Sequence, residues 1–373
     1  MRESVRLNLG LNRKNMDDYA YTNARIRAME GRLLSRDQYD SLLAQATLDG
    51  LVHGLRSLPY ARALEPVLAT LDRAQGLRTI GCLDEALRRD LVETLGILRG
   101  FFSDRSRELL DVLLLRWDVY NLKTVLRGKR AAAPIEEVLA MTFPVGLLDD
   151  IAVAELARAP TMQAVAHLLE MWRLPLARPV RSGLDQLGEA DDLQPLESEL
   201  DRLTLLHSCR LAVSEDENDR AVGSYLGFLA DSANLLAALR YLAERGARSS
   251  LEAGRHFLEA GGRFTRTRYE AVIGAPDLRE GLNRLVATSF GWLTDLFRAK
   301  DSVSPPLVER ELNRAAIRKS VALSRPDPLG IGPAIAYLER KTNEIRNLRM
   351  ILRGKVAGMQ PEQVEEWLIL WPI

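Results

Sequence analysis

Residue types that carry out catalysis or bind metals occur in this chain, but they are not spaced as such sites require. The four histidines are dispersed: His53, His167, His207 and His256. None has a second His or a Cys four residues away, the spacing that places two zinc ligands on one helix face. Cys82 and Cys209 are too far apart in the sequence to suggest either a disulfide framework or a zinc site. The sequence therefore predicts no metal site.

Two other stretches match reactive sites only in part. Asp149-Asp150 invites comparison with the aspartate-rich magnesium site of all-helical prenyl-chain enzymes, but Val153 and Ala154 stand where that site needs further acids. A solvated helix start explains the pair better. The segment 327–332 contains two glycines but lacks the Lys-Ser/Thr and the preceding strand of a phosphate loop. With no nucleophile elbow either, we predict no catalytic residues and no bound cofactor.

The most informative polar residues belong to a helical pattern that occurs three times. An acid is followed by Asn-Leu three and four residues later, and by Leu-Arg eight and nine residues later. The copies span 118–127, 231–240 and 344–353, so they are equally spaced and need no gap to be aligned. Their first three shared positions are Asp118, Asn121 and Leu122, then Asp231, Asn234 and Leu235, then Glu344, Asn347 and Leu348. Such a period predicts three similar helical units.

On a helix, the acid, the Asn and the two leucines of this signature lie along one broad stripe. The polar pair therefore lies at one end of an apolar face, where it needs hydrogen-bond partners from a neighbouring backbone or side chain. The closing arginine lies about 180° around the helix from the acid. It is therefore not expected to pair with the acid of its own signature.

Two interpretations of Arg127, Arg240 and Arg353 follow from this geometry. The structural interpretation is that each arginine satisfies carbonyls at a helix end or pairs with an acid of an adjacent unit. The functional interpretation is that three equivalent arginines line a shared central opening and contact a partner along a pseudo-threefold axis. Only the threefold recurrence favours the second.

The elements that position these residues are predicted to be helices throughout. Helical periodicity is clear in 107–126, 226–242 and 335–352, and no set of alternating strand segments is found. A weaker recurrence, Gly31-Arg-Leu33, Gly146-Leu-Leu148 and Gly262-Arg-Phe264, supports the repeat. We predict an all-α protein with three similar helical domains at 1–130, 131–245 and 246–373, the first of which carries an N-terminal tail.

Composition excludes several classes of function. The chain has 373 residues, 51 basic and 51 acidic, so no net charge favours binding to nucleic acid. No window of about 18 uncharged apolar residues is present, and the N-terminus lacks a secretory pattern. We predict no membrane span.

Three blocks along the chain together point to a family. They are 18–27 (DYAYTNARIR), 113–127 (LLLRWDVYNLKTVLR), and 327–332 (DPLGIG) with 336–349 (AYLERKTNEIRNLR). In order and spacing they resemble the C subunit of bacterial and archaeal V/A-type ATPases, the counterpart of the d subunit of the eukaryotic vacuolar enzyme. The residues before Asp18 and the acidic insertion Ser214–Arg220 have no counterpart in that pattern.

The resemblance implies a funnel of three helical domains with pseudo-threefold symmetry. It also implies a non-catalytic rotor connector on the cytoplasmic face of the membrane, which joins the central stalk to the proteolipid ring and transmits torque for proton or sodium transport. The alternative is a soluble helical repeat scaffold that binds an unrelated protein. A metal-dependent helical enzyme comes third.

Overall fold

The computed structural model describes residues 19–68, 76–185, 193, 194, 196–202, 211, 213–244, 257–259, 262–298, 300 and 302–370. Every regular element within these ranges is a helix, so the predicted all-α class is confirmed. The chain forms two compact units, the first made of residues 1–110 and 320–373 and the second of residues 111–319. The boundaries at residues 110 and 319 fall within the residue ranges of α6 (Asp104–Arg130) and α17 (Pro305–Ser324). The division into three domains at 131 and 246 stays a prediction.

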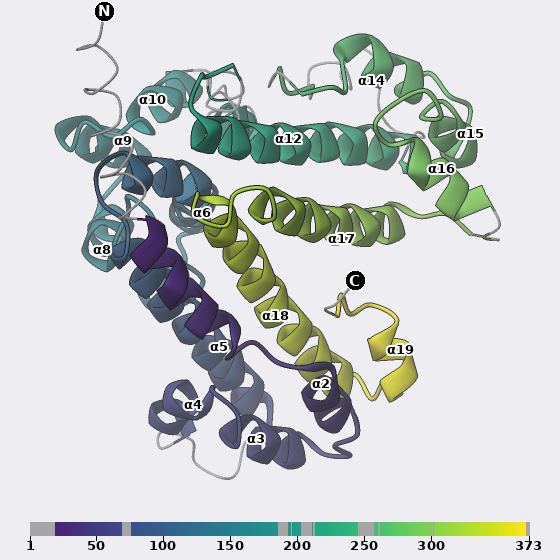
Figure 1. Cartoon of the computed structure of the whole chain (residues 1–373). Helices are drawn as coiled ribbons and strands as arrows, with labels where there is room; N and C mark the ends of the chain where they lie inside the picture. Colours follow the sequence, from purple (N-terminus) through teal and green to yellow (C-terminus); the bar gives the residue numbers. More distant parts are fainter. Residues whose placement is uncertain are drawn as a thin grey trace, which may run out of the picture. The chain divides into compact units, whose positions relative to one another are not determined.

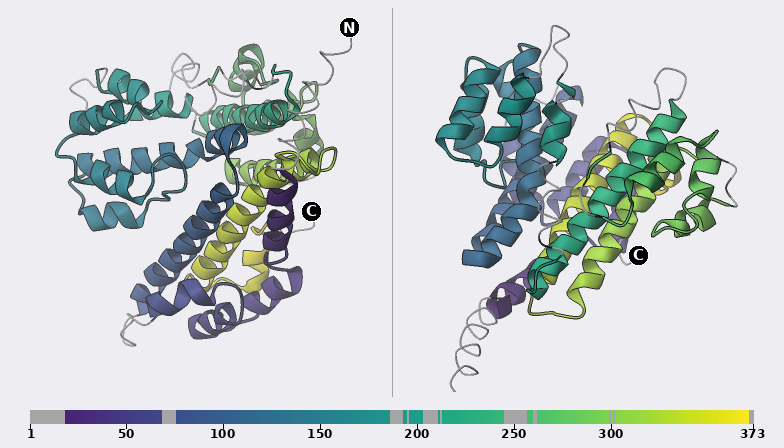
Figure 2. Two further views of the ribbon diagram at one scale, coloured as in Figure 1. Left: turned by 60° about the vertical axis from the view of Figure 1, so that its left-hand side comes forward. Right: turned by 90° about the horizontal axis from the view of Figure 1, so that it is seen from above.

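The first unit combines both ends of the chain. Its helices are residues 19–30, α2 (Arg36–Leu43), α3 (Leu48–Arg56), α4 (Ala61–Leu68), α5 (Gly76–Gly100), α18 (Gly332–Val356) and α19 (Pro361–Glu365). The long helices α5 and α18 pack side by side (Figures 1 and 2). Asn23 of the first helix donates to the carbonyls of Pro328 and Gly330, just before α18 begins. The N-terminal helix is thereby fixed to the start of the last long helix.

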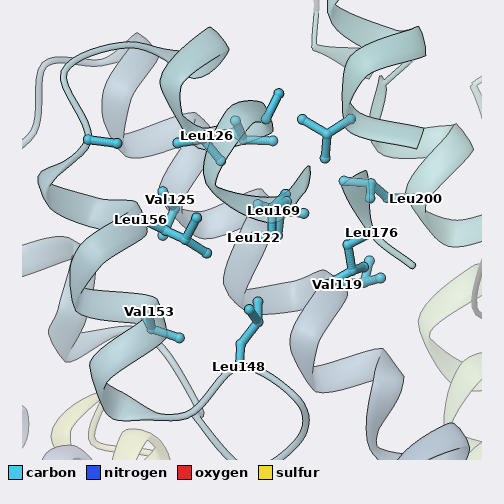
Figure 3. Packing of buried hydrophobic residues seen from close by; sticks show 14 of the residues in the cluster. Val119, Leu122, Val125, Leu126, Leu148, Val153, Leu156, Leu169, Leu176 and Leu200 are labelled. Atoms are coloured by element: carbon cyan, nitrogen blue, oxygen red, sulfur yellow. The ribbon is translucent and has the colours of Figure 1, made fainter. Parts of the chain in front are cut away.

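Two large apolar cores lie among the described residues of the second unit. Its helices there include α7 (Ile135–Ala140), α8 (Asp150–Arg158), α9 (Met162–Met171), α10 (Ala177–Asp185), α12 (Glu217–Ala243), α14 (Arg266–Ile273), α15 (Leu278–Asn283) and α16 (Gly291–Arg298). One core gathers leucines and valines of α6, α8 and α9 around Leu122 (Figure 3). The other is richer in aromatic residues and includes Leu235, Phe264 and Phe290. Each core thus contains the leucine of one signature.

Short helices begin at equivalent positions in three places. The residues preceding α2, α8 and α14 are Ser35, Asp149 and Thr265, and those preceding α3, α9 and α15 are Thr47, Thr161 and Asp277. All six are residue types favoured as N-caps, and all but Thr265 accept a backbone N–H in the first turn of the following helix. The interval between the two caps is the same in all three places, so an αα pair is repeated. Asp149 is therefore a helix cap, which agrees with the solvated helix start expected from the sequence.

Helix α12 is unusual because it is long and apolar enough to cross a membrane by length and composition alone. Of its most apolar window, 56% is buried, as in the core helix of a globular unit. Its start lies in the acidic insertion, where Asp216 accepts the N–H groups of Asn218 and Asp219. The insertion therefore caps this helix.

Candidate functional site: three junctions and their surface arginines

Each signature binds backbone groups of another segment, and we call each set of contacts a junction. In the first junction, the two carboxylate oxygens of Asp118 accept the N–H groups of Leu147 and Leu148, both at 2.9 Å. Asn121 donates to the carbonyl of Phe143 at 2.8 Å and accepts the N–H of the same residue at 2.6 Å. Both polar side chains are fully buried. The loop 143–148 is therefore held by four hydrogen bonds to one helix.

The second junction repeats this arrangement on α12. Asp231 accepts the N–H groups of Arg263 and Phe264 at 2.8 and 3.1 Å. Asn234 makes the same pair of hydrogen bonds to Leu258, at 3.0 and 2.8 Å. Burial raises the pKa of Asp231 above its ordinary value, although the N–H groups of Phe264 and Arg263 oppose the shift. Again one acid and one amide hold one neighbouring stretch of the chain.

The terminal junction, on α18, divides these contacts between the two ends of the chain. Asn347 exchanges two hydrogen bonds with Ile369, at 2.9 and 3.1 Å. The acid, Glu344, instead accepts the N–H of Leu34 at 2.5 Å. Ile369 is near the C-terminus and Leu34 is near the N-terminus. The acid and the amide therefore bind segments from opposite ends of the chain.

A buried charged network surrounds the carboxylate of the terminal junction. Lys341 lies 2.8 Å from Asp90 on α5 and 2.9 Å from Glu344, and it donates to the Tyr60 hydroxyl at 3.0 Å. Tyr60 in turn donates its O–H to Glu344. At the positions equivalent to Lys341, three residues before each acid, the other signatures have Leu115 and Phe228. This network therefore distinguishes the terminal junction.

Ionisation in this network is shifted by burial and by neighbouring charges. Burial alone would lower the pKa of Lys341, but Glu344 and Asp90 together raise it to about 12. Burial raises the pKa of Asp90, and the attraction of Lys341 opposes that shift. Burial, followed by the charge of Glu344, raises the pKa of the Tyr60 phenol well above its ordinary value. At neutral pH, Lys341 is therefore a charged counter-ion inside the first unit.

The glycine recurrence has a physical cause in two of its three copies. A Cβ atom on Gly146 would lie 2.3 Å from the Asp118 carboxylate, and one on Gly262 would lie 1.8 Å from that of Asp231. The same atom on Gly31 would meet nothing closer than 3.6 Å. The glycine pattern therefore placed the N-terminal copy one residue out of register, because Leu34, not Leu33, takes the position of Leu148 and Phe264.

The leucines and arginines of the signatures occupy opposite environments. Leu122, Leu235 and Leu348 are buried. The side chain of Arg127 is 62% exposed and forms a bidentate ion pair with Glu197, and that of Arg240 is 54% exposed and pairs with Glu309. Both glutamates belong to the next predicted repeat, as the structural interpretation expects. Arg353 is exposed and forms no ion pair within the described part of the chain. The three arginines thus present charge on the surface, and their contact with a partner stays a prediction.

One recurring contact was missed in the sequence. Two residues after the arginine, Lys129 donates to the carbonyls of Ala157 and Ala159, at 2.9 and 2.5 Å, and the equivalent Lys355 donates to Leu43 at 2.6 Å. These carbonyls end the short helices α8 and α2, where a lysine is favourable. The sequence feature that marks these lysines is Leu-Arg-Gly-Lys, which is shared by 126–129 and 352–355 and is absent from the second signature.

No group of acids, His or Cys among the described residues is arranged to hold a metal ion. His53 and His167 are exposed on α3 and α9, and His207 and His256 lie outside the described residues. The geometry of the junctions is that of rigid connections: buried polar side chains that fix helices to loops. What it can provide is mechanical stiffness and an exposed surface.

Comparison with known proteins gives a consistent result. Residues 22–367 match the model of the family described as ATP synthase (C/AC39) subunit. The C subunit of the A-type ATP synthase from Pyrococcus abyssi is 28% identical over 350 residues, which is 93% of this chain and 89% of that protein. Proteins of the same name from Methanocaldococcus jannaschii and Methanosarcina mazei are 24% and 26% identical, over 94% and 96% of this chain and 86% and 94% of theirs.

Proposed function

Because the chain belongs to the ATP synthase (C/AC39) subunit family, we propose that it is the non-catalytic connector of a rotary V/A-type ATPase. In this role it links the central stalk to the proteolipid ring of the membrane sector and transmits torque for proton or sodium transport. It lies on the cytoplasmic face of the membrane and is held there by other subunits. The observation that carries the proposal is the family match over residues 22–367.

The construction of the junctions supports this role. A part that transmits torque must not yield between its two attachment surfaces. Each signature ties its helix to other segments through charge-assisted and amide hydrogen bonds that are shielded from water, where such bonds are strongest. Glu344, Asp118 and Asp231 are all buried. The proposal needs no metal, cofactor or nucleophile.

Surface arginines are our candidates for contact with a partner. Arg127, Arg240 and Arg353 are equivalent in the three signatures and exposed, so they can meet an acidic surface on the stalk or the ring. We propose that they form one side of that contact around a pseudo-threefold axis in a funnel of three domains.

The alternative proposal is a helical repeat scaffold that binds a partner outside any ATPase. The exposed arginines and the rigid junctions fit that role as well. The nearly full-length match to proteins named as C subunits of A-type ATP synthases favours the connector.

Copurification tests the connector directly. The tagged chain is recovered from gently solubilised membranes of its own cells, and the proteins bound to it are identified by mass spectrometry. The connector predicts the nucleotide-binding head, the central stalk and the proteolipid ring. Recovery from the soluble fraction alone, without these subunits, would favour the scaffold.

Charge reversal tests the arginines. The triple variant Arg127→Glu, Arg240→Glu, Arg353→Glu is compared with a control triple, Arg56→Glu, Arg105→Glu, Arg181→Glu. The control side chains are 49–54% exposed and ion-paired, as Arg127 and Arg240 are. The first triple is expected to lose the stalk or ring subunits from the purified complex, and the control is expected to retain them. Equal retention by both triples would remove the arginines from the contact.

A further inference from the structure

In the terminal junction the acid and the amide do not bind one continuous loop, as they do in the first junction. In the first junction, Asp118 and Asn121 bind one continuous loop, 143–148, so each bond helps to hold the others in place. In the terminal junction, Asn347 binds Ile369, whereas Glu344 binds Leu34, 310 residues away. The segment Leu34–Tyr60, which contains α2 and α3, therefore receives only one backbone hydrogen bond from this signature. Because this segment is so far from Glu344 in the sequence, the chain itself does not hold the two close together.

The Glu344 carboxylate of the terminal junction has additional contacts. Tyr60, at the end of the segment, donates to the same carboxylate that binds Leu34, and Lys341 contacts both Tyr60 and Glu344. Asp90 on the adjacent α5 is the second carboxylate that pairs with Lys341. The equivalent positions on α6 and α12 are the apolar Leu115 and Phe228. The charged groups thus occur at the junction whose acid and amide bind two separate segments of the chain.

We propose that the network of Lys341, Glu344, Asp90 and Tyr60 is an ionic clasp that fastens the segment Leu34–Tyr60 to α18, and that this segment opens as one unit when the clasp is broken. Glu344 holds both ends of the segment, at Leu34 and at Tyr60. Without Lys341, the Glu344 carboxylate is a buried charge without its counter-ion, and movement of the segment would expose it to water. In the first junction Leu115 stands in place of Lys341, so the equivalent segment, 148–174, is not expected to open in this way. The proposal does not depend on the function of the whole complex.

Hydrogen exchange of the full chain, read by mass spectrometry, tests the clasp. In the variant Lys341→Met, peptides from 34–60 are expected to exchange at least about tenfold faster than in the wild type, while peptides from 148–174 keep their rate. Tyr60→Phe removes only the O–H and is expected to give a smaller increase in the same peptides. This milder variant keeps the test informative if Lys341→Met does not fold.

A neutral triple variant separates a clasp from ordinary packing. Lys341→Met combined with Glu344→Gln and Asp90→Asn leaves no buried charge unpaired, so exchange in 34–60 is expected to return toward the wild-type rate. Two results would overturn the proposal. One is equal acceleration of 34–60 and 148–174, which indicates global unfolding, and the other is a neutral triple that exchanges as fast as Lys341→Met alone.

Discussion

The first and terminal junctions use the same signature but differ in how they hold their loops. At the first junction Leu115 occupies the position of Lys341, and the loop 143–148 is bound at both of its ends. Glu344 holds two separate points of the N-terminal segment and lies among charged groups. The same polar pair thus binds one stretch of chain in the first junction, and it is accompanied by Lys341 and Asp90 in the terminal junction, where segments distant in the sequence meet.

The largest expected effect follows from removing the lysine of the terminal junction. Lys341→Met leaves the buried Glu344 and the partly buried Asp90 without their counter-ion, so it should lower the free energy of unfolding by about 3–5 kcal/mol. Urea denaturation measures the change. The matched control is Leu115→Met, which preserves volume and apolar character and should cost less than about 1.5 kcal/mol. Similar losses in the two variants would show that the junctions do not differ in this way.

Glycine substitutions compare the three loops. Gly146→Ala and Gly262→Ala place a methyl group against a buried carboxylate, and each should reduce stability by about 1–3 kcal/mol. Gly31→Ala should change stability by no more than about 0.5 kcal/mol, because a Cβ atom there would make only ordinary contacts, the nearest at 3.6 Å. Thermal unfolding of the three variants ranks their losses of stability. A loss for Gly31→Ala as large as for Gly262→Ala would contradict the register derived from the structure.

Alkaline pH should act on the terminal junction. The pKa of Lys341 is raised to about 12 from an ordinary 10.5, so its contribution to stability is complete below about 10.5 and is lost as the pH rises through 12. This shift corresponds to about 2 kcal/mol. The ionisable groups facing the network are Tyr39, Tyr60, Asp90, Glu93, Tyr337 and Glu344.

Urea denaturation between pH 9 and 12 compares the wild type with Lys341→Met, in which the same tyrosines are present. The stability difference between the two should narrow with rising pH. A difference that stays constant to pH 12 would contradict the assignment of a charged, paired lysine.

The smallest effects are expected at the surface arginines. Arg127→Gln and Arg240→Gln break exposed ion pairs with Glu197 and Glu309, which should change stability by less than about 1 kcal/mol. Urea denaturation checks this, with Arg181→Gln as the control for another exposed pair. A loss well beyond the range of exposed ion pairs, in either variant, would mean that the arginine is a structural residue and a poor candidate for contact with a partner.

Local patterns could be predicted because they depend on neighbours in the sequence. The helix over 335–352 was evident from its periodicity, and α18 runs from Gly332 to Val356. The buried leucines followed from the apolar stripe. Register in the loops was harder, as the error of one residue at Leu34 shows, because two of the three glycines are required by contact with a side chain and the third is not.

By itself, the sequence determined the helical class, the threefold signature and the family to which the chain belongs. Only the tertiary structure decided what each signature binds, because the partners of Asp118, Asp231 and Glu344 are backbone N–H groups, which every residue type except proline possesses. No side-chain pattern marks such a partner. The junction of Glu344 with Leu34 joins residues 310 apart, and only the folded backbone brings those two groups to a separation of 2.5 Å.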